Sequence, residues 1–203
     1  MPGRRGQAAR NDSLILRAAR EVFLADPKAP IAAVAERAGV GISALYRRYP
    51  GKEDLLRRLC HDGLLEFIAL AEAAGGERDP WQALCRFLRA VVDADVHSLT
   101  VHLAGTFAPT PQMEADAVRA NELALALLGR ARSAGRVRPD FADGDLTLLL
   151  EACAAIRVPD PERTRELRRR QLALIQAGML ASGGPELQGP PPTPIEVNWR
   201  WRR

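Results

Sequence analysis

Residues 31–48 restrict the fold of this chain more than any other stretch, because they carry the spacing of two short helices that cross at a glycine turn. The stretch reads IAAVAERAGVGISALYRR. Gly39 stands at the turn, where a residue tolerant of positive φ is needed. Ala35 supplies the small side chain at which the second helix approaches the first. Since these positions must agree at once, the pattern predicts a helix-turn-helix.

The side chains of this two-helix unit divide into an inward and an outward set. The inward set, which forms a small shared core, is Val34, Ala38, Val40 and Leu45. The outward set is Ser43, Ala44, Tyr46, Arg47 and Arg48. An ordinary helical hairpin satisfies one or two of these positions, not all of them. We therefore expect the second helix to present a polar, basic face to a partner.

Charge is distributed unevenly along the 203 residues. Residues 1–58 hold 12 Lys/Arg and 6 Asp/Glu, a net charge of +6, whereas the remainder holds 17 and 19, a net charge of −2. The positive charge thus coincides with the helix-turn-helix, where the phosphates of double-stranded DNA would lie. A single arginine is often only part of a solvated face, but the coincidence with the motif favours DNA binding.

The same segment resembles the TetR family of bacterial transcription factors. The matching residues are Ala38-Gly39-Val40, Leu45-Tyr46, Tyr49-Pro50, Lys52-Glu53 and Leu55-Leu56, and upstream Ile15, Ala18, Ala19 and Phe23. The match covers about the first quarter of the chain; the rest agrees in length and helical layout. Pro30 and Gly41 depart from the family, which commonly has a hydroxyl residue at these two helix starts.

Held by its neighbours, the second short helix can enter the major groove of DNA. Ser43, Ala44 and Arg47 would lie nearest the base edges, Arg47 against a guanine. Further contacts, to phosphates, are expected from Tyr46, Arg48, Tyr49 and Lys52, and the resemblance implies this role for Tyr46 and Lys52 in particular. Arg4 and Arg5 form either a minor-groove arm or a disordered charged terminus.

The pattern of apolar residues predicts an all-α chain without strands. We expect helices over residues 13–25, 31–38, 42–48, 52–74, 80–94, 112–133, 143–156 and 162–181, with Asn11, Asp12 or Ser13 as the first cap and an irregular stretch over 97–107. This layout divides into a DNA-binding domain (1–51), a helical effector-binding and dimerisation domain (52–182) and a Pro/Gly-rich tail (183–203). The tail is expected to be extended or disordered, with Trp199 and Trp201 either loose or docked.

A single helix-turn-helix contacts few base pairs, so specific binding needs a two-fold dimer on a palindromic operator. The last two helices are the candidate interface, which by resemblance forms a four-helix bundle; the alternative is an intrachain core. The candidate interface residues are Leu148, Leu149, Ala152, Leu167, Gln171, Leu174, Ile175 and Met179.

The resemblance also implies a pocket for a small-molecule effector among the helices of residues 80–156. The candidate lining residues, each of which also fits a plain core, are Trp81, Phe87, Val91, His102, Phe107, Met113 and Leu127. Charged residues are few in the middle of this domain, so we expect a largely apolar effector. Its binding would have to differ between two states of the dimer.

Other site types find little support. The three histidines form no HExxH set, and the chain has no P-loop and no GxGxxG motif, so we expect neither an enzyme nor a cofactor. Asp93 and His97 stand four residues apart, which fits a metal pair or, more commonly, a polar face. The cysteines form no CxxC pair, and the chain has neither a run of ~20 apolar residues nor a secretory signal, so a cytoplasmic protein without a metal or membrane partner is expected.

The leading hypothesis is a ligand-responsive homodimeric transcriptional regulator, in particular a repressor. A second hypothesis is a DNA-binding activator or architectural protein without an effector, which would lack a cavity of about 300 Å³ in the larger domain. A third is a helical small-molecule-binding protein whose DNA motif is vestigial, which would show no salt-dependent binding to duplex DNA.

Overall fold

Helices account for nearly all the regular structure of this chain in a computed structural model, which describes residues 3–181 and 184–198. The predicted all-α fold class is confirmed. The helices are α1 (Gly3–Ala25), α2 (Ile31–Ala38), α3 (Ile42–Arg48), α4 (Lys52–Gly75), α5 (Pro80–Ala94), α6 (Val96–Leu103), α7 (Pro111–Ser133), α8 (Asp143–Ala155), α9 (Pro161–Met179) and α10 (Pro194–Val197). Extended pairing within these residues is limited to an isolated antiparallel bridge between Val137 and Leu180.

Two predicted boundaries differ from the structure. Helix α1 begins at Gly3, not near Ser13, because the residues before Ser13 include no proline after position 2 and are mostly good helix formers. The residues expected to cap α1 therefore lie inside it. The stretch predicted as irregular contains α6, which is separated from α5 by Asp95 in the left-handed region, at φ 56°. No glycine or proline marks this break in the sequence.

Helix α4 belongs to two hydrophobic cores. Leu55, Leu56 and Leu59 in its first half pack with α1–α3, whereas Ala71 and Ala74 in its second half pack with α5 and α7–α9. The first core also takes in the α6 side chains Leu99 and Leu103, followed by Phe107 and Met113. The side chains that bury the DNA-binding unit thus come partly from beyond residue 51.

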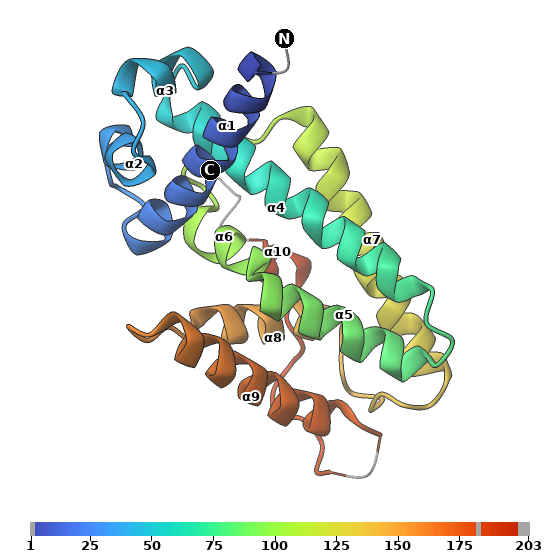
Figure 1. Ribbon diagram of the computed structural model, residues 1–203. Helices are drawn as coiled ribbons and strands as arrows, with labels where there is room; N and C mark the ends of the chain where they lie inside the picture. The colour runs from blue at the N-terminus through green and yellow to red at the C-terminus, as the bar shows by residue number, and fades with distance from the viewer. Residues whose placement is uncertain (1–2, 182–183, 199–203) are drawn as a thin grey trace.

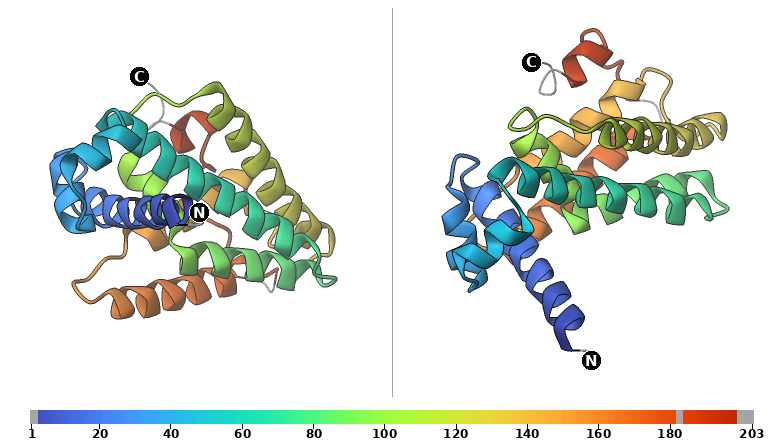
Figure 2. Two further views of the ribbon diagram at one scale, coloured as in Figure 1. Left: turned by 45° about the horizontal axis from the view of Figure 1, so that its top comes forward. Right: turned by 90° about the horizontal axis from the view of Figure 1, so that it is seen from above.

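The helices of the body lie in layers, with α5 and α6 between α4 on one side and α8 and α9 on the other (Figure 1). Helices α4 and α7 lie side by side, α5 packs on α4 and α9, and α8 lies against α6 and α9. Helix α4 can approach α6 closely because residue 63 is glycine: a Cβ there would lie 2.8 Å from Cδ1 of Leu99. The N-terminal end of α1 projects away from the body, as Figure 2 shows.

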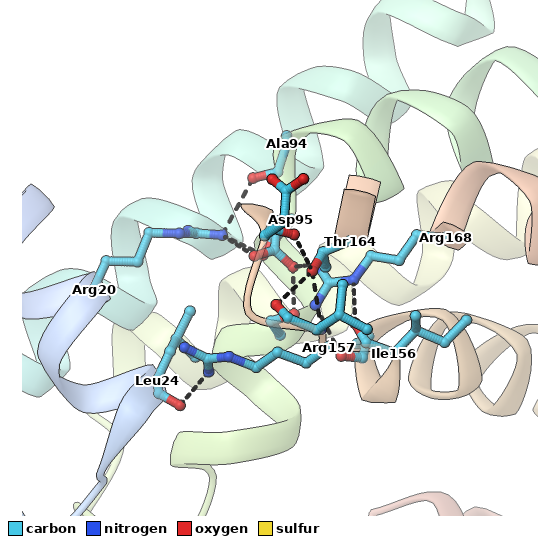
Figure 3. A network of polar contacts seen from close by, with 12 residues as sticks. Arg20, Leu24, Ala94, Asp95, Ile156, Arg157, Thr164 and Arg168 are labelled. Carbon is cyan, nitrogen blue, oxygen red and sulfur yellow. Dashed lines mark hydrogen bonds and ion pairs between the residues drawn. The ribbon is translucent and has the colours of Figure 1, made fainter. Parts of the chain in front are cut away.

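A polar network centred on Asp95 ties the N-terminal unit to the body (Figure 3). Arg20 of α1 lies 3.3 Å from Oδ2 of Asp95 and donates to the carbonyl of Ala94. Arg168 of α9 pairs with Oδ1 of the same carboxylate, and its side chain is only 8% exposed. The other two nitrogens of Arg168 donate to the carbonyls of Ile156 (2.9 Å) and Ala154 (3.0 Å), so each nitrogen of this buried guanidinium has an acceptor.

The described part of the tail is held against the body. Arg138 donates to the carbonyl of Pro185, and the backbone N–H of Leu187 donates to Asp140 at 2.8 Å. Hydrogen bonds from Arg138 and from Leu187 lower the pKa of Asp140. Trp199 and Trp201, for which two placements were predicted, lie outside the described residues.

Replacing Asp95 by Asn should destabilise the fold, because it leaves the buried Arg168 without its anion. Asn tolerates the left-handed conformation, so the backbone can stay in place. We expect the free energy of unfolding, measured by urea denaturation, to fall by about 1–3 kcal/mol.

Asp93→Asn is the matched control, since Asp93 pairs with Arg169 at a more exposed position (31% and 49%). It should change the free energy of unfolding by less than about 1 kcal/mol. Equal losses from the two variants would contradict the central position of Asp95.

Candidate nucleic-acid interface

Helix α3 presents a polar face to solvent. Ser43, Arg47 and Arg48 are exposed, and Tyr46 is 49% exposed. On the opposite face, Leu45 is fully buried in the core shared by α1, α2 and α4. A helix of seven residues is unstable alone, so this single anchor and its neighbours hold the polar face in place.

The turn between α2 and α3 has the predicted geometry. Gly39 has φ 66°, and the backbone N–H of Val40 donates to the carbonyl of Ala35 at 3.0 Å. The left-handed glycine at this turn is thus confirmed. Neither Pro30 nor Gly41 provides a side-chain cap, so the helix starts depend on packing rather than on a hydroxyl.

Asp12 fastens α1 to the end of α3. Arg48 donates from Nε (2.9 Å) and Nη2 (3.0 Å) to its two carboxylate oxygens, and the Tyr49 hydroxyl donates at 2.6 Å. The Arg48 hydrogen bond lowers the pKa of Asp12. Burial, followed by the bond to Asp12, raises the pKa of Tyr49.

This arrangement corrects the role expected of Tyr49. Its side chain was expected to contact phosphate, but Tyr49 is 5% exposed and its hydroxyl is used inside the protein. Arg48, also expected to bind phosphate, is exposed but its guanidinium is engaged by Asp12. The sequence could not reveal this, because Asp12 was expected at the end of a helix rather than inside one.

Lys52 lies at the first position of α4 and holds the loop between α1 and α2. Its ammonium donates to the carbonyls of Pro27 (2.8 Å) and Ala29 (2.7 Å) and lies 5.1 Å from the ring centroid of Phe23. An ammonium has three protons, so one remains for another acceptor. The sequence predicted its place at the helix start but not its backbone partners.

Arg47 is the arginine of α3 whose side chain is available. It makes no hydrogen bond or ion pair with the described residues, unlike its neighbour Arg48. Arg4 and Arg5 continue the backbone of α1, while their side chains lie outside the described residues. The uncommitted polar surface of α3 therefore consists of Ser43, Tyr46 and Arg47.

A second candidate site lies in the body, where two adjoining cavities of about 360 Å³ and 210 Å³ open between α4, α6 and α7, the smaller one bounded also by α8. They share Cys60, Leu64, Thr100, Ala117 and Asn198. Most of the other side chains around them are apolar. Three carboxylates stand among them: Glu114 in the larger cavity, and Asp143 and Glu151 in the smaller. Burial raises the pKa of the Cys60 thiol to about 12, so it stays protonated at neutral pH.

The predicted pocket residues mostly lie elsewhere. Met113 lines the larger cavity, and His102 lines a separate hollow beside α1. The remaining predicted residues are buried in the two cores: Trp81, Phe87, Val91, Phe107 and Leu127. Large apolar side chains are the best core fillers, and they are therefore poor guides to a cavity.

The predicted interface residues fall into three sets by exposure. Leu148, Ala152 and Leu174 are exposed, Leu174 at 61%, whereas Leu149 and Met179 are buried within the subunit. The partly buried remainder comprises Leu167, Gln171 and Ile175. Helices α8 and α9 thus carry an apolar face on the surface as well as an inward face.

Among the described residues, no three His, Cys, Asp or Glu side chains are grouped so as to hold a metal ion. The carboxylate of Asp93, considered as a metal ligand with His97, accepts from Arg169 at 2.6 Å instead. No helix in the described part of the chain is long and apolar enough to cross a membrane.

Family models match both parts of the chain. Residues 15–59 match the bacterial regulatory proteins of the tetR family, and residues 79–181 match the C-terminal domain of SbtR-like transcriptional regulators. The second match covers just over half of the chain.

Individual relatives agree with these matches. The HTH-type transcriptional repressor LfrR of Mycolicibacterium smegmatis is 31% identical over 142 residues, which cover 68% of this chain and 72% of LfrR. The solved structure of LfrR in complex with proflavine, from Mycobacterium smegmatis, is 27% identical, covers 88% of this chain and 99% of that one, and has a TM-score of 0.64. The regulator PfmR of Thermus thermophilus is 23% identical over 80% of this chain and 97% of its own, with a TM-score of 0.57, and supports the fold alone.

Asp12→Asn should loosen the attachment of α3 in a pH-dependent way. The pKa of Asp12 is lower in the folded chain than the ordinary value of 3.8, so its stabilising effect is complete above that value and is lost as pH falls below it. At pH 7 we expect a loss of about 1–2 kcal/mol in the free energy of unfolding.

Measured by denaturation at several pH values, the difference between wild type and Asp12→Asn should shrink below about pH 4. Tyr49→Phe, which keeps the ion pair with Arg48, should cost about 1 kcal/mol and retain most of the acid dependence. A difference independent of pH would show that the ion pair does not stabilise the fold.

Proposed function

This chain belongs to the TetR family of bacterial transcriptional regulators, and we propose that it is a homodimeric repressor released from a palindromic DNA operator by a small effector. The exposed polar face of α3 carries the proposal. The face is anchored from behind by Leu45 and from the side by Asp12, so it is held rigidly while its outer side chains remain uncommitted. Such an arrangement suits a recognition helix in the major groove.

Within this face, the side chains have different roles. Arg47 has no partner among the described residues and is the side chain we assign to a base edge, with Ser43 and Ala44 beside it. Tyr46 is assigned to a phosphate, together with the third proton of Lys52. Arg48 and Tyr49 act indirectly, because they fix the angle at which α3 leaves α1.

We expect the α3 helices of the two protomers to contact the operator about 34 Å apart along one face of the duplex. The exposed apolar side chains of α8 and α9, Leu148 and Leu174, support a two-fold contact there, since apolar surface of this kind is normally covered. The buried Leu149 and Met179 would support this surface from behind.

The effector is proposed to bind in the two adjoining cavities beside α4 and α7. LfrR, the 31% identical relative, has been solved in complex with proflavine, a planar aromatic cation. The cavities here combine apolar walls with the carboxylate of Glu114, which suits an apolar molecule that carries a positive charge. Asp143 also lines the smaller cavity, but it is paired with Arg132 at 3.0 Å. This refines the expectation of a largely apolar effector.

Helix α6 offers a physical route from this site to DNA. Thr100 lines both cavities, while Leu99 and Leu103 on the same helix are buried in the core of the DNA-binding unit. A molecule that shifts α6 must therefore also shift the side chains against which α1 and α4 pack. Release follows if the effector binds the shifted state more tightly.

Arg47→Ala should relax sequence reading, whereas Tyr46→Phe should weaken binding to every sequence alike. Loss of an arginine on a guanine costs about 1–3 kcal/mol of discrimination at one base position, and a phosphate contact carries no sequence information. The measurement is fluorescence anisotropy with a duplex obtained by in vitro selection and with its single-base variants. Equal, sequence-independent losses from both variants would contradict the assignment of Arg47.

Ala117→Trp should fill the space common to both cavities and abolish binding of a cavity ligand. Proflavine is the probe, followed by its fluorescence in the absence of DNA, because it also intercalates. We expect saturable binding to the wild type and an affinity loss of at least about tenfold in the variant. Ala115→Trp, on the exposed face of the same helix, is the control and should bind as the wild type does.

If neither substitution alters proflavine binding, the effector site lies elsewhere. If the wild type binds DNA but binds no proflavine, the chain recognises a different effector class from LfrR.

A further inference from the structure

A separate hollow of about 400 Å³ lies between the DNA-binding unit and the body, away from the cavities beside α7. Its walls come from α1, the junction of α5 and α6, the start of α9 and the connection between α8 and α9. The residues that matter for its chemistry are Arg20, Leu24, Asp95, Arg157, Thr164 and Arg168. Figure 3 shows these side chains converging from three separate parts of the chain.

The hollow carries more positive than negative charge once every ion pair is assigned. Of its carboxylates, Glu21 is paired with Arg37 at 2.5 Å and Asp93 with Arg169 at 2.6 Å, and both of these arginines lie outside the hollow. Arg165, which lies in the wall, is paired with Glu162. Each of these three ion pairs has no net charge, so the net charge of the hollow depends on Asp95 and the arginines around it.

In that network one carboxylate faces several guanidinium groups. Asp95 is shared by Arg20 and Arg168, so two positive charges meet one negative charge. Arg157 adds another, and its hydrogen bond among the described residues goes to the carbonyl of Leu24, which bears no formal charge. The centre of the hollow thus has two positive charges without matching carboxylates.

Arg157 is the group best placed to bind a ligand. It is exposed, whereas Arg168 is 7% exposed and each of its side-chain nitrogens already donates to Asp95, Ile156 or Ala154. A guanidinium offers five N–H donors in a planar fork that matches carboxylate or phosphate oxygens. One carbonyl partner leaves most of these donors available.

Much of the remaining wall is apolar, and the hollow is larger than a bare inorganic ion requires. Leu24, Val92, Val158, Pro159 and Pro161 line the hollow around the arginines. Its volume lies in the range typical of pockets for small organic molecules. A ligand that matches both the basic and the apolar parts of the hollow has an anionic group against the arginines and a small apolar group against these side chains.

We propose that this hollow is a second ligand site, which binds a small organic anion through a carboxylate or phosphate group held by Arg157 with Arg20 beside it. It differs from the cavities beside α7 in position and in charge. Its walls include α1 of the DNA-binding unit and α9 of the body, so an occupant bridges the two.

Binding can be measured without DNA, so the test is independent of the proposed regulatory function. The probes are phenyl phosphate, benzoate and inorganic phosphate, titrated into the full-length protein by isothermal calorimetry at constant ionic strength maintained with sodium chloride. We expect saturable binding, with phenyl phosphate or benzoate tighter than inorganic phosphate because of the apolar walls.

Arg157→Gln should weaken the binding of the tightest probe by about tenfold or more, as expected for loss of a charge-assisted hydrogen bond. Arg157→Lys, which keeps the charge, should retain part of the affinity. Arg170→Gln removes an exposed arginine of α9 outside the hollow and is the control; it should leave binding within about twofold. Thermal unfolding of each variant checks that it is folded.

The proposal is overturned if none of the three probes binds the wild type more tightly than about 10 mM. It is equally overturned if Arg157→Gln, folded as the wild type is, binds the probes unchanged. A parallel loss in Arg170→Gln would mean that binding depends on general surface charge and would also refute the site.

Discussion

The position of the DNA-binding unit depends on a hydrophobic core to which the body also contributes side chains. Leu99 and Leu103 of α6 are buried in the same core as Leu45 of α3, and the first half of α4 closes that core. Since packed interiors deform little, a shift of α6 cannot leave the unit unchanged. The cavities beside α6 and α7, where we propose that an effector binds, adjoin the helix that supplies these side chains. This constraint gives a physical basis for a ligand-responsive regulator.

Polar contacts add a second connection between the same parts. Asp95 holds Arg20 of α1 and Arg168 of α9 from a left-handed position between α5 and α6. Hydrophobic burial supplies most of the free energy of folding, but it is not directional, whereas a carboxylate shared by two guanidinium groups fixes relative orientation. The organic-anion site proposed beside this network lies at the same seam.

The sequence predicted local features well and long-range partners poorly. Gly39, Ala35 and Leu45 identified the helix-turn-helix because their roles depend on neighbours within a few residues. Tyr49 and Lys52 were placed on the correct elements, but their partners Asp12, Pro27 and Ala29 are distant in sequence. Of the predicted pocket residues, Met113 alone lines these cavities, because the apolar periodicity that identifies Phe87 or Leu127 as buried does not distinguish a filled core from a lined cavity. Small and polar residues such as Thr100 and Ala117 share the lining with Leu64 and Met113.

In vitro selection from random duplex DNA, followed by the stoichiometry of the selected complex in sedimentation, tests the central claim most directly. The account predicts enrichment of an inverted repeat that binds two protomers and resists excess nonspecific duplex at about 0.15 M salt. No enriched motif, or weak binding that disappears with modest salt, would contradict a dimeric sequence-specific regulator.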